Sequence, residues 1–148
     1  PTASPKPSSA ASDVYKRQPF SFAVTHLALG PGRTRRAQFR AAREVAFAGA
    51  EPAVLVGDLN SAPSHARDYS VFTRGLTDVW AAKHRFPLAK RFLGRTNPVI
   101  PIPMRRIDYI LASRDIRPIS AKTLRTHASD HLPVVAELEI PHVDLATE

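Results

Sequence analysis

Apolar and polar positions along the chain fall into blocks that predict strands alternating with helices. Five blocks rich in β-branched and aromatic residues predict strands over residues 20–27, 54–57, 105–112, 118–124 and 133–140. Between the first two, residues 33–48 place Phe39, Ala42, Val45 and Ala46 near one stripe at helical spacing, while arginines line much of another. A strand, a crossover helix and a second strand predict parallel pairing of the two strands with a right-handed connection.

The pattern loosens after Pro63 and then returns to order. Residues 66–73 and 76–82 predict two short helices, and residues 83–103 read as a long basic loop with four prolines, placed at the rim of a site. In the strand over residues 105–112, alternation puts Ile107, Tyr109 and Leu111 on one face and Asp108 on the other. This last position is an acidic residue inside an apolar strand.

The N-terminal residues differ from the rest in composition. Residues 1–11 are Pro, Ser, Ala, Thr and one Lys, with nothing to bury, which predicts disorder through residue 18. Residues 13–18, with the sequence DVYKRQ, can be encoded by a transposon end used as an adapter in sequencing libraries. We interpret residues 1–18 as a non-native tail and expect the native N-terminal part to be missing. Residues 19–140 would then be the C-terminal portion of a domain, and 141–148 a short tail.

Composition narrows the possible chemistry without defining a compartment. The chain has no cysteine, which excludes disulfides, thiol nucleophiles and cysteine metal sites. No apolar run approaches the length of a membrane span. The net charge of +8 suits a phosphate-bearing partner, either nucleic acid or an anionic lipid head group. Localisation stays open.

Residues that could take part in catalysis lie near the ends of the predicted strands. Asp58 and Asn60 follow an apolar run, and their side chains would leave from the same face if the strand continued through them; a plain turn is the alternative. His26 ends the first strand. A buried carboxylate at Asp108 needs a partner, and His131 is a histidine whose ring that carboxylate can orient.

Three motifs carry a family resemblance that runs in order over about residues 19–140. They are Gly57-Asp58-Leu59-Asn60, Arg106-Ile107-Asp108-Tyr109-Ile110 and Ser129-Asp130-His131. On these motifs the chain resembles the endonuclease/exonuclease/phosphatase superfamily. The resemblance implies an α/β fold, a four-layer α/β/β/α sandwich of the deoxyribonuclease I type with its N-terminal part missing. It also implies hydrolysis of phosphate esters with Mg²⁺ or Mn²⁺.

The resemblance further implies roles for individual residues. Asp58 would position or deprotonate the attacking water, and Asn60 would hold the phosphate oxygens. His131, oriented by Asp108, would act at the scissile phosphate as base or charged stabiliser. His26 would be a second histidine on the charge that develops there. A cation, imidazolium and amide donors and an aligned water are effective tools against the negative charge of a phosphate ester.

The resemblance gives Asp130 and Asp58 as metal carboxylates and Arg106 as a substrate contact. The family also begins with strands bearing an asparagine and a glutamate, the latter its principal metal ligand, and residues 1–18 contain neither residue. We therefore expect the 148-residue chain to be inactive by itself, with weak metal affinity and an exposed sheet edge prone to aggregation.

The substrate is open between a small molecule, a lipid head group and nucleic acid. The segment Thr25-His26-Leu27 looks more like the branch with sphingomyelinase-like phosphodiesterases, inositol phosphatases, deoxyribonuclease I and bacterial hydrolases than like abasic-site endonucleases. A bacterial metal-dependent phosphodiesterase is our leading expectation. A nuclease using residues 33–43 and 83–95 as a basic track, a non-catalytic phosphate-binding module on the same fold, and an unrelated basic α/β domain remain alternatives.

Overall fold

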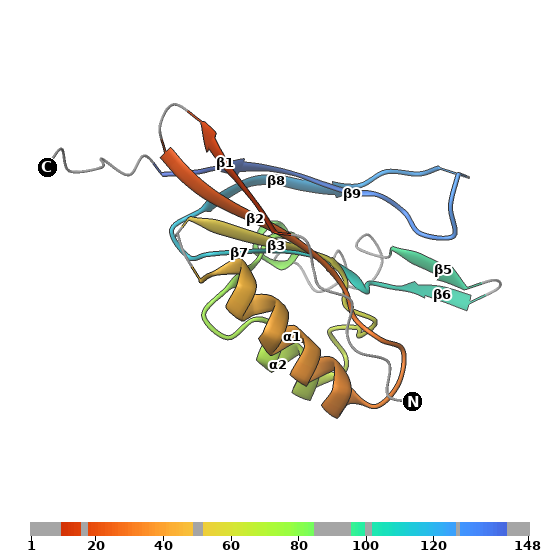
Figure 1. The fold of residues 1–148 in the computed structure, drawn as a ribbon. Helices are drawn as coiled ribbons and strands as arrows, with labels where there is room; N and C mark the ends of the chain where they lie inside the picture. The colour runs from red at the N-terminus through yellow and green to blue at the C-terminus, as the bar shows by residue number, and fades with distance from the viewer. Residues whose placement is uncertain are drawn as a thin grey trace, which may run out of the picture.

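A computed structural model describes residues 10–15, 18–48, 52–84, 96–99, 102–126 and 128–141 (Figure 1). Within these residues, strands and helices alternate from residue 18 to residue 83, and five strands follow. The elements in chain order are β1 (Ala10–Tyr15), β2 (Gln18–His26), α1 (Gly32–Ala46), β3 (Ala53–Asp58), α2 (Ala66–Phe72), β4 (Thr77–Asp78), α3 (Val79–Lys83), β5 (Asn97–Val99), β6 (Ile102–Arg105), β7 (Asp108–Ala112), β8 (Arg117–Thr123) and β9 (Val134–Glu139). Five of these, β2, β3, β7, β8 and β9, are the strands that the apolar blocks predict.

The main sheet has the strand order β1-β2-β3-β7-β4. Strand β2 pairs in parallel with β3, as the crossover through α1 predicts, and β3 pairs antiparallel with β7. In this register His26 lies opposite Asp58, and Asp58 lies opposite Asp108. Strand pairing alone therefore places three of the expected site residues in one row across three neighbouring strands.

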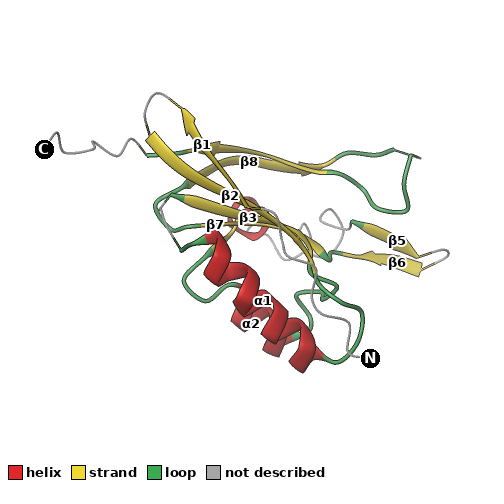
Figure 2. Cartoon of the chain, in the orientation of Figure 1, coloured by secondary structure: helices red, strands yellow, loops and turns green. Residues whose placement is uncertain are grey.

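The two faces of the main sheet are covered differently (Figure 2). Helices α1 and α2 lie on one face, where Phe39 and Phe72 pack with ring centroids 4.7 Å apart against Leu55 and Leu111 of the sheet. The two-stranded sheet β8-β9 lies over the other face, where a second apolar cluster includes Val54 of β3 and Leu138 of β9. Helix, sheet and sheet are thus three successive layers of a mixed α/β fold. None of the described helices is long and apolar enough to cross a bilayer.

Between the two sheets lies an apolar cleft of about 630 Å³. Phe22 of β2 and Val135 of β9 line it and keep 39% and 41% of their surfaces exposed. Asp108 and His131 line the same cleft. The cleft therefore leads from the apolar layer between the sheets to the strand ends.

Two predictions about irregular segments are wrong. Residues 10–15 of the expected disordered tail form β1, which pairs antiparallel with β2 from Ala10↔Ala23 to Tyr15↔Gln18. The edge of β2 offers a row of backbone donors and acceptors, which an extended segment can satisfy whatever its side chains.

Within the expected loop over 83–103, β5 and β6 form an antiparallel pair; residues 85–95, 100 and 101 lie outside the described residues. The short-helix prediction holds for α2, whereas residues 77 and 78 belong to β4 before α3 begins.

Candidate active site

The site is built at the ends of β2, β3 and β7. His26 and Asp58 are the last residues of their parallel strands, and Asp108 is the first residue of the antiparallel strand β7. Backbone hydrogen bonds continue just beyond the strands, from Leu27 N–H to the Asp58 carbonyl (2.9 Å) and from Leu59 N–H to the Ile107 carbonyl (2.8 Å). The backbone under the site is therefore fixed on both sides of Asp58.

Asp58 and Asn60 form a tight turn and do not continue the strand. The Asn60 backbone N–H donates to Asp58 Oδ1 at 2.8 Å, and Asn60 has a φ of 49°, in the left-handed region that asparagine tolerates better than most residues. The strand does not continue through Asn60, because the chain turns at Leu59, and the turn given as the alternative is the one observed. The turn still brings them together: Asn60 Nδ2 donates to the Leu27 carbonyl (2.7 Å) and lies 3.2 Å from His26 Nε2.

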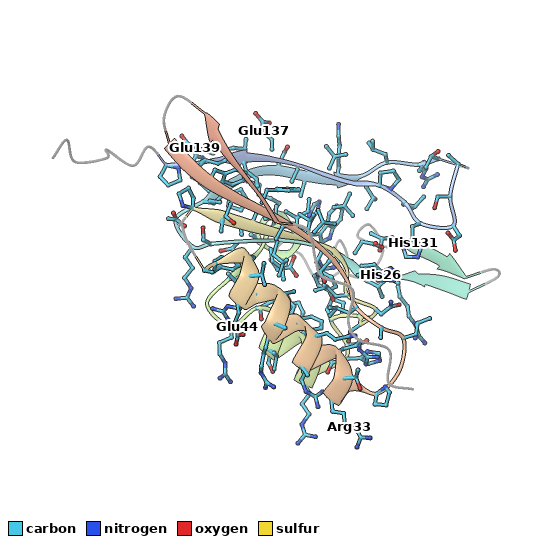
Figure 3. The ribbon with its side chains drawn as sticks, viewed as in Figure 1. His26, Arg33, Glu44, His131, Glu137 and Glu139 are labelled. Carbon is cyan, nitrogen blue, oxygen red and sulfur yellow. The ribbon has the colours of Figure 1, made fainter. Side chains whose placement is uncertain are left out.

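The second carboxylate oxygen of Asp58 lies between two histidine rings. Asp58 Oδ2 is 3.5 Å from His26 Nε2 and 4.0 Å from His131 Nε2. Figure 3 shows the two histidines at the same end of the main sheet. Burial raises the pKa of Asp58, and the nearby charge of Asp108 adds to the rise, while the Asn60 amide and both histidines oppose it. Asp58 is thus a more basic carboxylate than an exposed aspartate.

Asp108 and His131 form the pair that the sequence led us to expect. His131 Nδ1 lies 3.0 Å from Asp108 Oδ2 and 3.2 Å from Oδ1. An ionised carboxylate only accepts hydrogen bonds, so the pair favours a hydrogen on Nδ1 and turns Nε2 toward Asp58. The His131 backbone N–H donates to Ser129 Oγ at 3.0 Å, which holds the loop before β9.

Two expected site residues are placed elsewhere. Asp130 is exposed beside Ser129, whose Oγ donates to Asp130 Oδ1 at 3.3 Å. Among the described residues, the group whose ligand atoms all lie within 4.8 Å of one another consists of Asp58, Asp108 and His131. This group contains Asp58 and does not contain Asp130.

Arg106 is a structural residue in this fold. Its two terminal nitrogens donate to the two oxygens of Asp78 at 3.0 and 2.6 Å, and its guanidinium lies 4.5 Å from the centre of the Tyr109 ring. Only 8% of the residue is exposed. The expectation of a substrate contact is wrong, because a buried arginine needs the carboxylate that already holds it. Burial raises the pKa of Tyr69, whose hydroxyl donates to Asp78, to about 12.

A polar network beneath the Asp58 turn was not expected from the sequence. Asp68 of α2 is buried, and its oxygens accept hydrogen bonds from Arg35 (3.0 and 2.9 Å), from Arg36 (2.5 Å) and from Ser61 Oγ (2.9 Å). Burial raises the pKa of Asp68, but these donors outweigh burial and lower it below the ordinary value. Because Ser61 directly follows Asn60, the network ties the turn to both helices. The signal that could have found it is an aspartate in a short helix that otherwise packs through aromatic residues.

Thr96 was also missed. It lies within the predicted loop, yet it is fully buried, and its hydroxyl accepts hydrogen bonds from the backbone N–H groups of Ile107 (3.1 Å) and Asp108 (3.2 Å). A single threonine in a basic, proline-rich stretch gives no sequence signal of this kind.

Fold and site together define a class: a layered α/β protein with an aspartate–histidine site at neighbouring strand ends. The chain belongs to the endonuclease/exonuclease/phosphatase family, whose family model matches residues 10–131. The family name joins nucleases and phosphatases, both of which hydrolyse phosphate esters. A comparison with curated protein sequences finds no significant match.

Solved structures with the same fold include three that illustrate the range of the family. An endonuclease/exonuclease/phosphatase from Bacteroides vulgatus has a TM-score of 0.65 at 20% identity, over 84% of this chain and 51% of that one. A mannosyl-6-phosphatase from Bacteroides thetaiotaomicron has a TM-score of 0.57 at 21% identity, over 83% of this chain and 52% of that one. D. rerio TDP2, complexed with a single-strand DNA product, has a TM-score of 0.63 at 18% identity, over 88% and 60%. The chain thus spans roughly half the length of these structures, and likeness at such identities shows the fold alone.

Proposed function

We propose that the site hydrolyses phosphate esters with a divalent cation, as a phosphodiesterase or phosphatase. The observation that carries the proposal is Asp58 Oδ2, which lies within 4.0 Å of the Nε2 atoms of both His26 and His131. An acceptor for a water proton lies there between two groups that can donate to phosphate oxygens.

The donor set fits a hard divalent cation. Asp58 and Asp108 supply carboxylate oxygens within reach of one ion. Mg²⁺ and Mn²⁺ prefer oxygen ligands, and Mg²⁺ commonly keeps several waters while the protein supplies one or two carboxylates. When bound, such a cation would polarise a phosphate oxygen and lower the pKa of a coordinated water. We propose Asp58 as its main protein ligand and Asp108 as the second carboxylate within reach.

Asp58 has the geometry of a group that orients and deprotonates water. Its Oδ1 is held by the Asn60 backbone N–H, so only Oδ2 is directed toward the histidines. Without a bound cation, burial raises the pKa of Asp58, which favours proton acceptance by this carboxylate.

The histidines and Asn60 would act on the phosphate. Protonated His131 would donate from Nε2 to a phosphate oxygen, and Asp108 at Nδ1 would stabilise the imidazolium charge. His26, whose side chain is 73% exposed, would donate from Nε2, which lies 3.5 Å from Asp58 Oδ2. Asn60 would donate its amide to the same phosphate group.

One observation favours a nuclease as the second candidate. Arg33 and Arg40 of α1 are exposed, and Figure 3 shows Arg33 pointing away from the ribbon. By contrast, Arg36 is held by Asp68, and Arg43 donates to the Arg74 carbonyl at 2.7 Å. The exposed pair would serve as phosphate contacts if the substrate were a nucleic acid.

The test is a phosphoester panel run on the 148-residue chain and on the product of the complete gene. The panel contains a phosphomonoester, a small phosphodiester, a lipid-like phosphodiester and single-stranded DNA, each with Mg²⁺, with Mn²⁺ and with EDTA. We expect cation-dependent turnover from the complete product, falling about 10²–10⁴-fold in Asp58→Asn and His131→Gln. The exposed Asp115→Asn is the matched control and should leave turnover unchanged.

The panel also separates the alternatives. Phosphate binding without turnover in the complete product would replace the hydrolase with a non-catalytic phosphate-binding module. Turnover of DNA alone would favour the nuclease. Measurable turnover by the 148-residue chain would overturn the expectation that this chain is inactive by itself.

A further inference from the structure

Thr96 links the three segments that carry the site, although its side chain reaches none of the site's side chains. It lies just before β5 and is 0% exposed. Its hydroxyl accepts from Ile107 N–H at 3.1 Å and from Asp108 N–H at 3.2 Å, and its backbone N–H donates to the Arg105 carbonyl at 3.1 Å. The hydroxyl itself donates to the Arg105 carbonyl at 3.4 Å, so four contacts from one residue cover the backbone leading into β7.

The backbone of Thr96 reaches the histidine loop. Leu132 N–H donates to the Thr96 carbonyl at 2.6 Å, and Leu132 directly follows His131. One buried residue therefore holds the backbone of Asp108 with its hydroxyl and the backbone beside His131 with its carbonyl. The side chains of Asp108 and His131 lie 3.0 Å apart, from Oδ2 to Nδ1.

A peptide unit at the start of β7 extends the link to Asp58. The peptide between Ile107 and Asp108 donates its N–H, which is that of Asp108, to Thr96 Oγ1 at 3.2 Å, and its carbonyl, which is that of Ile107, accepts from Leu59 N–H at 2.8 Å. Leu59 lies inside the turn between Asp58 and Asn60. The Thr96 hydroxyl is therefore connected, through a single peptide, to the turn that orients the Asp58 carboxylate.

We propose that Thr96 is a positioning residue, whose hydroxyl sets the Asp108–His131 pair and thereby holds the hydrogen of the His131 ring on Nδ1. The proposal rests on the proposed function only in that this pair is part of the hydrolytic site. Two backbone donors satisfied by one buried oxygen lose their partner together when the hydroxyl is removed, so the start of β7 shifts to find other acceptors. A shift there changes the position of the Asp108 carboxylate relative to His131.

The test replaces the hydroxyl by a methyl group of the same shape. The 148-residue chain is labelled with ¹⁵N-histidine, and the ring nitrogens are observed by NMR at an alkaline pH at which their chemical shifts no longer change with pH. In the parent we expect the Nδ1–H tautomer of His131 to predominate, because Asp108 accepts from Nδ1. In Thr96→Val we expect that tautomer to lose its predominance. Thr96→Ser, which keeps the hydroxyl, should restore the parent spectrum.

Thr73 provides a matched control for the same chemical change. Its hydroxyl donates to the Tyr69 carbonyl at 2.8 Å at the end of α2, away from the site. Thr73→Val should leave the His131 tautomer as in the parent. An effect at Thr96 that is absent at Thr73 cannot come from a general loss of a threonine hydroxyl.

Several results would overturn the proposal. They are an unchanged tautomer in Thr96→Val, a loss of the tautomer in Thr96→Ser, and an unfolded Thr96→Val chain, which would make the hydroxyl a requirement of the fold. A parent in which Nε2–H predominates would contradict the Asp108–His131 contact itself and count against the proposed function as well. A failure confined to the Thr96 variants leaves the proposed function untouched, since the spectrum does not depend on turnover.

Discussion

Replacing Asp68 by asparagine removes the negative charge from the network under the Asp58 turn. The Asp68 side chain is 4% exposed, and it accepts two hydrogen bonds from Arg35, one from Arg36 and one from Ser61. Removing one partner of a buried ion pair costs about 3–5 kcal/mol, because the other charge stays buried without compensation. Arg35 and Arg36 retain some access to water, at 11% and 21% exposure. We therefore expect Asp68→Asn to lower the free energy of unfolding by about 3 kcal/mol, at the lower end of that range.

The measurement is urea unfolding at neutral pH, followed by circular dichroism, with the exposed Asp115→Asn as the matched control. The control should stay within about 0.5 kcal/mol of the parent. The pH dependence gives a second reading. The pKa of Asp68 is lowered in the folded state, so its stabilisation is fully present above the unfolded value of about 3.9 and is lost as pH falls through the folded value. The difference between parent and Asp68→Asn should be constant from pH 7 to about 5 and shrink below about 4.

The reasoning would be refuted by a loss of less than about 1 kcal/mol in Asp68→Asn, since that is the range of an exposed ion pair. It would also be refuted if the difference between the two proteins grew on acidification, since the pKa of Asp68 would then be raised by folding. A loss equal to that of Asp115→Asn would show that the network contributes no more than an exposed carboxylate.

Three further predictions follow from single contacts. In Gly57→Ala the added Cβ would lie 1.7 Å from the Thr25 carbonyl oxygen, and the alanine would have to adopt a φ of +146°. We therefore expect the free energy of unfolding to fall by more than about 4 kcal/mol, or the variant not to fold, in which case no thermal unfolding transition is observed. Arg106→Met should lower the free energy of unfolding, measured in urea, by about 3–5 kcal/mol. The double variant Arg106→Met with Asp78→Leu should lower it by less. A smaller loss in the single variant would count against a structural role for Arg106. Arg40→Glu should reduce the slope of log DNA affinity against log salt by about 1 in the complete protein if α1 contacts DNA, whereas an unchanged slope would remove Arg40 from the nuclease reading.

His26 and Asp58 could be predicted at strand ends because each borders an apolar run. Asp108 was expected inside a strand over residues 105–112 and is instead the first residue of β7, and strand pairing brings the three together. The partner of Asp108 could be predicted because a buried carboxylate requires one, and His131 supplies it. Hydrophobic periodicity also predicted the strands that carry these residues, because buried positions in a strand follow a regular spacing. Features that depend on burial could thus be predicted from the sequence alone.

Residues whose role depends on a distant partner could not be predicted in this way. Arg106 lies in a motif beside Asp108, but its charge is held by Asp78, 28 residues away in sequence. Asp68 and Arg35 are 33 residues apart, and the helical pattern places arginines of α1 on a solvated face. Thr96 acts through a hydroxyl that bonds backbone groups 11 and 12 residues further on. Hydrophobic periodicity predicts which side chains are buried, but it does not predict which polar group a buried side chain binds.

The position of the site and its ability to turn over substrate are separable properties of this chain. The contacts described for His26, Asp58, Asn60, Asp108 and His131 all come from residues 26–132, including the Asn60 amide on Asp58 and the Asp108 carboxylate on His131. A chain that spans about half the length of its structural relatives can therefore hold these five residues in the geometry observed. Turnover requires, besides geometry, a cation held firmly enough to neutralise phosphate charge, and this property is separate from the contacts that position the five side chains. We therefore expect the Nδ1–H tautomer of His131 to predominate in the 148-residue chain even if the phosphoester panel detects no turnover from this chain.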